Sequence, residues 1–267
     1  MSPKYSARTV RRTAAAAVVT AALLVPLAAC GSDDDSDGKK EGGSGKDVKL
    51  TVLAASSLTD VFATAEKTYE KEHPGTGITV SAAGSQELAA QVKQGSPADV
   101  LVTADTKTMD GLKGETNKPD IIAKNRLVIA TREGNPQKVA SLKDLSDSKL
   151  KVVLADDTVP VGRYSKQVLD AQKVSVQPVS KEANVRSVLS KVELGEADAG
   201  IVYKTDAATA TDKVDAVDIP DAQNAVASYP AATLKGSKNG DAAAAFVKWL
   251  STPEAQKILR DAGFQKP

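Results

Sequence analysis

Two serines stand where a strand-like run gives way to a helix-like one. Ser57 follows the apolar run 50–55, and Ser85 follows the run 78–83. Either serine can cap the helix that follows it. The first N–H groups of a helix have no partner within the helix and carry partial positive charge, and a serine hydroxyl adds another donor. Two such helix starts facing one spot would form an uncharged trap for an anion, which indicates binding rather than catalysis.

The elements that must position these serines alternate regularly along the chain. Strand-like apolar runs are followed by amphipathic, helix-like segments from about residue 48 onward, which predicts an α/β fold. We expect strands at 50–55, 78–83, 98–104, 126–130, 151–155, 175–179, 199–203 and 214–219, and helices at 58–72, 88–95, 241–250 and 253–262. In such folds ligands bind beyond the carboxyl ends of the strands or in a cleft between lobes.

Strand ends in the second half of the chain offer donors of another kind. The segment 159–164 follows the predicted strand at 151–155, the segment 184–186 opens a predicted helix, and Tyr203 ends a strand. Taken singly, each residue has an ordinary explanation, as a helix cap for the serines and as a core residue for Val185 and Tyr203. Only their occurrence together favours a ligand shell.

Six short motifs follow one another in a recognisable order. They are ASSLTD (55–60), GSQELA (84–89), GSPADV (95–100), VPVGRY (159–164), NVR (184–186) and GIVY (200–203). With these motifs in register, the chain from Lys49 to Phe264 resembles the molybdate-binding proteins of ABC importers, which are solute-binding lipoproteins. The resemblance implies a two-lobed type II periplasmic-binding-protein fold of the α/β class, with the ligand cleft between the lobes. It also implies a shell of neutral donors, namely Ser57, Ser85, Val161, Val185 and Tyr203.

The resemblance implies a role for each donor. The serines match by hydroxyl and main chain, the two valines by main-chain N–H, and the tyrosine by its hydroxyl. The implied ligand is molybdate or tungstate, passed to an ABC permease, and no cofactor is implied. Molybdate is a dianion that only accepts hydrogen bonds, so donors alone satisfy it. Family members often have alanine at the place of Val161 and a second serine at that of Gln86, which bears on pocket size and on a secondary contact.

The resemblance also implies how the chain is divided. We expect lobe 1 at 48–129 with a return segment at 229–267, and lobe 2 at 130–228. The runs 126–131 and 229–234 are the predicted crossings between lobes. We expect the lobes to close about these crossings over a dehydrated oxyanion.

The first 47 residues read as export and attachment signals. Residues 1–29 hold four basic residues and no acid before an apolar stretch, which is typical of a secretory signal, and the end of this stretch resembles a lipobox that places Cys30 as a lipidated residue. Residues 30–47 are polar and glycine-rich, as in a flexible tether. We therefore expect attachment to the outer face of the bacterial cytoplasmic membrane.

Charge and composition exclude several classes of protein. The chain has 35 basic and 34 acidic residues, and without its first 47 residues the two signs balance, which argues against nucleic-acid binding. The single histidine, His73, precedes Pro74 in a helix-ending turn, so no base is expected near either serine. We expect a monomer that is not an enzyme. The alternatives are the same fold binding sulfate or a small organic anion, and a surface adhesion or folding factor.

Charged residues near the motifs have ordinary interpretations. Arg163 and Arg186 follow the proposed amide donors, and we expect them to face outward or to pair with Asp156, Asp157 or Glu182. Three aspartates at helix starts or strand ends could be taken for a metal site, but carboxylates are common there, so we expect none; they are Asp60, Asp99 and Asp105.

Overall fold

A computed structural model describes residues 48–267, which form one compact unit. The predictions on the signal segment, on Cys30 and on the tether lie outside the described residues. The strands are β1 (Val48–Ala55), β2 (Thr76–Ala83), β3 (Val100–Val102), β4 (Asp120–Arg132), β5 (Val152–Ala155), β6 (Ser180–Glu182), β7 (Ala199–Tyr203), β8 (Val214–Asp218) and β9 (Val226–Thr233). The α-helices are α1 (Thr59–Glu72), α2 (Ser85–Lys93), α3 (Thr106–Asp110), α4 (Pro160–Ala171), α5 (Val185–Glu193), α6 (Lys204–Ala207), α7 (Gly240–Trp249) and α8 (Pro253–Asp261). Short 3₁₀ turns lie at η1 (Ser56–Leu58), η2 (Leu142–Ser146) and η3 (Asp221–Gln223).

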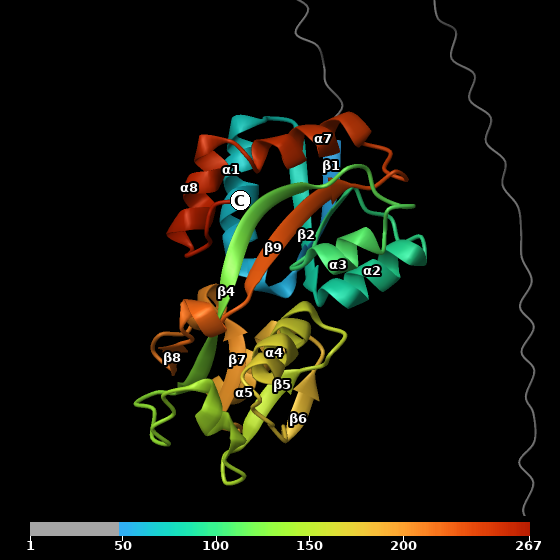
Figure 1. The fold of residues 1–267 in the computed structure, drawn as a ribbon. Coiled ribbons are helices and arrows are strands. Elements are labelled where there is room, and N and C mark those ends of the chain that lie inside the picture. Colours follow the sequence, from blue (N-terminus) through green and yellow to red (C-terminus); the bar gives the residue numbers. More distant parts are fainter. Residues whose placement is uncertain (1–47) are drawn as a thin grey trace, which may run out of the picture. The chain divides into compact units, whose positions relative to one another are not determined.

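The strands form two halves of one hydrogen-bonded path. The first half runs β2-β1-β3-β9-β4, with β1 parallel to both β2 and β3. The second half runs β4-β7-β5-β6, and β8 pairs with β4 beside it. Figure 1 shows α1, α7 and α8 on one side of the first half and α2 and α3 on the other. Helices α4 and α5 lie beside the strands of the second half.

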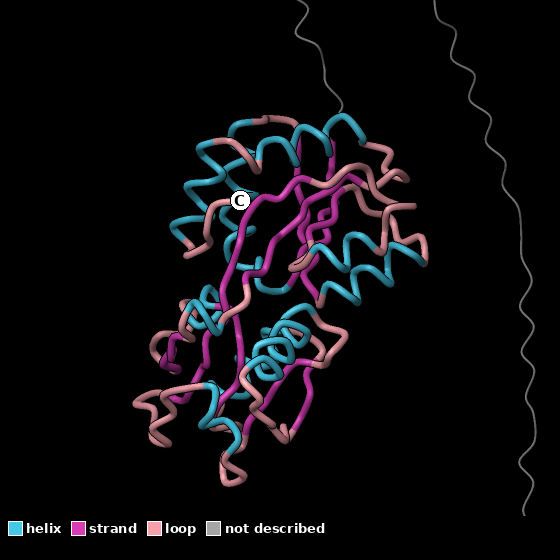
Figure 2. Tube along the Cα trace, in the orientation of Figure 1, coloured by secondary structure: helices cyan, strands magenta, loops and turns pink. Residues whose placement is uncertain are grey.

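Strand β4 is shared by both halves and changes partners along its length. Its residue Arg126 pairs with Val226 of β9 in the first half, and the next residue, Leu127, pairs with Tyr203 of β7 in the second. The Asn224 side chain accepts from Leu127 N–H and donates to Leu127 C=O, so the chain returning to β9 is tied to this same point. Figure 2 shows the long strand passing through both parts. We call residues 48–126 and 226–267 lobe 1 and residues 127–225 lobe 2; the changes of partner lie a few residues before the predicted boundaries at 130 and 228.

The core is mostly aliphatic, with one aromatic cluster between α1 and α7 and a smaller one beside β9. Helix α1 buries Val61, Phe62, Ala65 and Tyr69 on one face, as the spacing predicts. The Tyr69 ring lies edge-on to Phe246 and Trp249 of α7, with ring centroids 5.0 and 5.2 Å apart. Within residues 48–267, no helix is both long enough and apolar enough to cross a membrane.

The prediction of a strand at 175–179 is wrong. Those residues are irregular, and the pairing with β5 begins only at Ser180, which lies opposite Val153. Pro178 has no N–H to donate to a strand ladder, so regular pairing starts after it. Val179 N–H makes the first contact, with Val152 C=O at 2.8 Å.

Candidate functional site

All five residues predicted to form the ligand shell lie around one pocket between the lobes. Lobe 1 supplies residues 55–57, Gly84, Ser85 and Ala104, and lobe 2 supplies residues 159–161, Val185 and Tyr203. The empty space among these residues is about 200 Å³, including the part that is open to solvent. The arrangement therefore suits a small ligand.

The two serines do not cap helices, which corrects the prediction that they could. Gly84 is the N-cap of α2, and its N–H donates to the Glu87 carboxylate at 3.0 Å. Ser85, one residue later, instead accepts from Ala104 N–H at 3.0 Å. Ser57 lies inside the turn η1, and its Oγ lies 2.9 Å from the hydroxyl of Tyr229. Both serines are buried, and neither hydroxyl makes a capping hydrogen bond.

The lobe 2 side of the pocket is built from helix starts. Val161 is in the first turn of α4, after Pro160 in the position that tolerates proline, and Val185 is the first residue of α5. Asn184 caps α5 by accepting from Ser187 N–H at 3.0 Å. The N–H groups of the first helical residues have no acceptor within the helix. Both valines can therefore offer main-chain donors to the pocket.

Tyr203 brings an unpaired donor into this pocket. Its side chain is 1% exposed, and its hydroxyl has no hydrogen-bond partner. Burial raises the pKa of Tyr203 well above the usual value, so the group keeps its hydrogen. A buried hydroxyl without a partner costs about 1–3 kcal/mol, and such groups in native proteins call for an explanation. An acceptor bound in the pocket would supply one.

Arg163 bridges the lobes and does not pair with the carboxylates predicted for it in lobe 2, so that prediction is corrected. Its guanidinium contacts the carboxylate of Asp105 in lobe 1, with Nε 3.0 Å from Oδ2, and also Thr108 Oγ1 at 2.8 Å. Within lobe 2 it donates to the Thr158 carbonyl. Asp156 and Asp157 bind Thr158 and Lys181 instead. These contacts account for the charge of Arg163 without a ligand.

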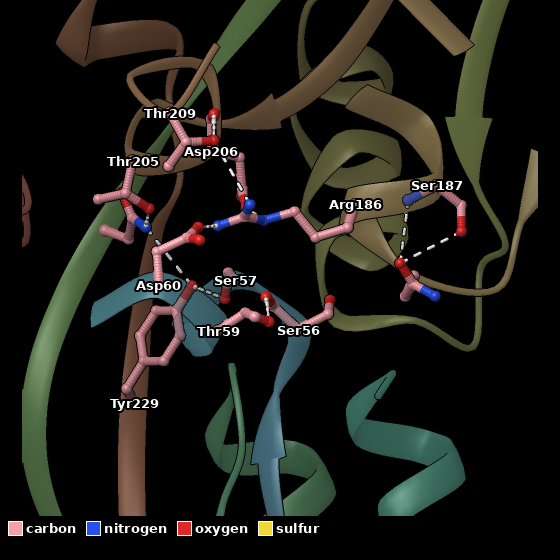
Figure 3. Close-up of polar contacts among 12 residues, drawn as sticks. Ser56, Ser57, Thr59, Asp60, Arg186, Ser187, Thr205, Asp206, Thr209 and Tyr229 are labelled. Atoms are coloured by element: carbon pink, nitrogen blue, oxygen red, sulfur yellow. Dashed lines mark hydrogen bonds and ion pairs between the residues drawn. The ribbon is translucent and has the colours of Figure 1, made fainter. Parts of the chain in front are cut away.

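Arg186 also bridges the lobes, again with partners that were not predicted. Its Nη2 lies 2.6 Å from Asp60 of lobe 1, and its Nε lies 2.7 Å from Asp206 of lobe 2, as Figure 3 shows. Burial would lower the pKa of Arg186, but the two carboxylates outweigh burial and raise it. Burial raises the pKa of Asp206 to about 6, and its second oxygen has no partner.

A third contact between the lobes comes from Gln86. Its Nε2 donates to the Ala183 carbonyl at 2.7 Å, just before the helix start at Val185. A serine at this position would be too short to make this contact. Its Oε1 is buried without a partner. Gln86 therefore links α2 to lobe 2.

The aspartates that resembled a metal site have other partners. Asp60 and Asp105 pair with the two bridging arginines, and Asp99 accepts from Ser237 Oγ at 2.6 Å and from Thr51 N–H at 2.7 Å. Within residues 48–267, no group of three or more potential ligands is placed to hold a metal ion.

Sequence reasoning missed the residues that hold the serines in place. Tyr229 and the N–H of Ala104 were not candidates, because nothing in their local sequence distinguishes them from strand and loop residues. Tyr229 is separated from Ser57 by 172 positions, so only the path of the chain brings them together.

Comparison with known proteins identifies the family. The family model of the bacterial extracellular solute-binding proteins matches residues 50–265. The chain belongs to this family. As a solute-binding protein it is not an enzyme, which confirms that prediction, and its two-lobed fold of the periplasmic binding proteins is confirmed as well.

Individual relatives of this solute-binding protein narrow the comparison. It is 37% identical to the molybdate-binding protein ModA of Mycobacterium tuberculosis, over 82% of this chain and 85% of that one. It is 33% identical to YvgL of Bacillus subtilis, named as a candidate ABC transporter substrate-binding lipoprotein, over 83% and 88% of the two chains. The periplasmic molybdate-binding protein of Azotobacter vinelandii has the same fold, with a TM-score of 0.70, 22% identity, and coverage of 82% and 99%.

Proposed function

We propose that this solute-binding protein captures molybdate, and tungstate with it, in the pocket between its lobes. The observation that carries the proposal is the buried hydroxyl of Tyr203, a residue that lines the pocket, because this hydroxyl has no hydrogen-bond partner. It is joined there by the hydroxyls of Ser57 and Ser85 and by the main-chain N–H groups at Val161 and Val185. The molybdate-binding relative supports the choice of ligand.

The chemistry of the proposed shell favours the binding of a fully deprotonated dianion. Every polar group proposed to touch the ligand is uncharged and has a hydrogen to donate, and molybdate offers only acceptors. The nearby arginines, Arg163 and Arg186, are engaged with carboxylates. Hydrogen phosphate would bring a proton that needs an acceptor, and leaving it unmatched would cost about 1–3 kcal/mol. Sulfate would be distinguished mainly by its smaller size.

The proposal includes how the protein works in transport. The lobes open to admit the ion and close upon it through the contacts of Gln86, Arg163 and Arg186, so that binding selects the closed state. The closed form then docks on an ABC permease. A lipid anchor at Cys30 would keep the protein at the outer face of the cytoplasmic membrane, in keeping with the lipoprotein name of the Bacillus subtilis relative.

Isothermal titration calorimetry tests the ligand and the shell together. We expect molybdate and tungstate to bind with similar affinity, and sulfate to bind more weakly. Tyr203→Phe removes one hydrogen bond to a charged ligand, worth about 1.5–3 kcal/mol, so molybdate affinity should fall about 10- to 150-fold. Tyr69→Phe, at a buried tyrosine of the aromatic cluster, is the matched control and should leave affinity unchanged.

Two results would reject the proposal. Tighter binding of sulfate than of molybdate would assign the pocket to another oxyanion. Equal molybdate affinity in Tyr203→Phe and in the unchanged protein would remove the hydroxyl from the shell.

A further inference from the structure

The hydroxyl of Ser57 is held by a chain of buried polar side chains that leads away from the pocket. Tyr229 Oη lies 2.9 Å from Ser57 Oγ, and Figure 3 shows the tyrosine pointing at the serine. Behind it, Asn125 Nδ2 lies 3.5 Å from Tyr229 Oη and 2.8 Å from Thr205 Oγ1. All four side chains are at most 3% exposed. Neither Tyr229 nor Asn125 lines the pocket, so neither is explained as a ligand contact.

The direction of these hydrogen bonds is set at Asn125. The main-chain N–H of Arg126 donates to Asn125 Oδ1 at 2.9 Å, which turns the amide nitrogen toward Tyr229 and Thr205. An amide nitrogen only donates, so the Tyr229 oxygen receives a hydrogen from Asn125. Burial raises the pKa of Tyr229, so the tyrosine keeps its own hydrogen. Within residues 48–267 the only other partner of the Tyr229 hydroxyl is Ser57 Oγ, 2.9 Å away, so that hydrogen points to Ser57.

This direction decides what Ser57 can offer to a ligand. Because its oxygen already accepts from Tyr229, its own hydrogen is left for the pocket. Ser85 is in the same condition, since the N–H of Ala104 donates to its oxygen at 3.0 Å. A serine hydroxyl without such a partner can rotate and either donate or accept. The polar chain behind Ser57 removes that freedom.

We propose that Asn125 and Tyr229 are positioning residues that fix the Ser57 hydroxyl as a hydrogen-bond donor, so that the pocket favours oxyanions without a proton over protonated ones. The inference rests on the proposed function, because it requires an oxyanion next to Ser57. It goes further by assigning part of the selectivity to residues that do not touch the ligand. The order of action is Asn125, then Tyr229, then Ser57, then the ion.

A double-mutant cycle tests whether Tyr229 acts through Ser57. Tyr229→Phe should lower molybdate affinity on the order of tenfold, the worth of one ordinary hydrogen bond. In a Ser57→Ala background the same change should lower affinity by less than about twofold, because the hydroxyl to be oriented is gone. In a Ser85→Ala background, the matched control, the tenfold loss should persist. Equal losses in all three backgrounds would overturn the inference.

The selectivity between protonated and unprotonated oxyanions gives a second readout. A general loss of packing would not change this selectivity. With sodium phosphate as the probe at mildly alkaline pH, where the ion keeps one proton, Tyr229→Phe should bind phosphate more tightly than the unchanged protein does. In the variant, the Ser57 oxygen is free to accept a hydrogen bond from the protonated oxygen of the phosphate. Phosphate binding that is equal or weaker in the variant would overturn the assignment of selectivity.

Asn125→Asp provides an independent variant in case Tyr229→Phe does not fold. The new carboxylate can only accept, so Tyr229 would turn its hydrogen toward it, and Ser57 would donate to Tyr229 instead of to the ion. Molybdate affinity should fall about 10- to 150-fold, as in Ser57→Ala. Unchanged affinity in Asn125→Asp would overturn the inference alone, whereas no oxyanion binding by the unchanged protein would overturn the proposed function as well.

Discussion

The two arginine bridges beside the pocket look alike but are built differently. Arg163 pairs with one carboxylate, Asp105, which also accepts from Thr108 N–H as the cap of α3. Arg186 pairs with two carboxylates, one in each lobe. Of these, Asp60 has a side chain that is 58% exposed, and Asp206 has one that is fully buried.

The two arginines therefore have different physical roles. The contact of Arg163 with Asp105 joins the lobes, so its loss should act on lobe closure and hence on ligand affinity. The contact of Arg186 with Asp206 lies within lobe 2 and compensates a buried charge, so its loss should act on folding. Both Asp105 and Asp206 are buried, but Asp105 also accepts from Thr108 N–H and keeps that hydrogen bond when its arginine is lost. A buried charge that loses its partner is costly.

The largest expected effect is that of Arg186→Ala on stability. The change leaves the Asp206 carboxylate buried without its cation, so the free energy of unfolding at mildly alkaline pH should fall by about 3–5 kcal/mol. Urea denaturation followed by circular dichroism measures the loss. Adding Asp206→Asn to Arg186→Ala removes the unpaired buried charge and should recover much of the lost free energy of unfolding. A loss no larger than that of Arg163→Ala would contradict the distinction between the bridges.

The next effect is a pH dependence of stability carried by Asp206. Burial raises its pKa from 3.8 to about 6, so the folded protein holds this proton more tightly than the unfolded chain does. Its contribution to stability is therefore present below about pH 4 and is lost as pH rises to about 6, a change of up to about 3 kcal/mol. Asp206→Asn lacks this titration, so from pH 4 to pH 7 its stability should gain on the unchanged protein. Parallel stability curves in denaturant titrations at each pH would refute this.

A pair of glycines extends the comparison to the main chain. A Cβ added at Gly162 would lie 2.0 Å from the Asp156 carbonyl of its own lobe, so Gly162→Ala should cost about 1–3 kcal/mol of stability whether or not the lobes are closed. A Cβ at Gly84 would lie 2.5 Å from the end of the Gln86 side chain, which can move, and 2.6 Å from the Ala183 carbonyl of the other lobe, which cannot move easily. Gly84→Ala should therefore lower molybdate affinity on the order of tenfold while changing stability of the empty protein by less than about 0.5 kcal/mol. Calorimetry with thermal unfolding separates the two, and equal stability losses would contradict the assignment.

The smallest expected effect is that of Arg163→Ala. The Arg163 side chain is 21% exposed, and the buried Asp105 that it leaves behind keeps its hydrogen bond from Thr108 N–H. Molybdate affinity should fall by less than about fivefold, and the free energy of unfolding should fall by less than it does in Arg186→Ala. A loss in calorimetric titration as large as that of Tyr203→Phe would indicate that Arg163 contacts the ion directly.

The residues of the candidate site could be predicted because each belongs to a short motif. Ser57, Ser85, Val161 and Val185 all stand at the change from strand or loop to helix, and Tyr203 ends a strand. Local pattern indicated these segments, and the resemblance of the ordered motifs to a known family selected the residues. Their assignment to ligand binding remains a prediction. The partners of Arg163 and Arg186 were predicted wrongly, because the nearest carboxylates in sequence were favoured over those that the other lobe supplies.

The sequence by itself determined the alternation of strands and helices, the membership in a solute-binding family, and the kinds of donor available at the strand ends. These depend on local periodicity and on short motifs. Only the tertiary structure decided which group each buried hydroxyl contacts, which carboxylate meets each arginine, and where the lobes touch. The physical reason is that hydrogen bonds and ion pairs act over about 3 Å, and residues as far apart in the chain as Ser57 and Tyr229 come within that range only when the whole chain is folded.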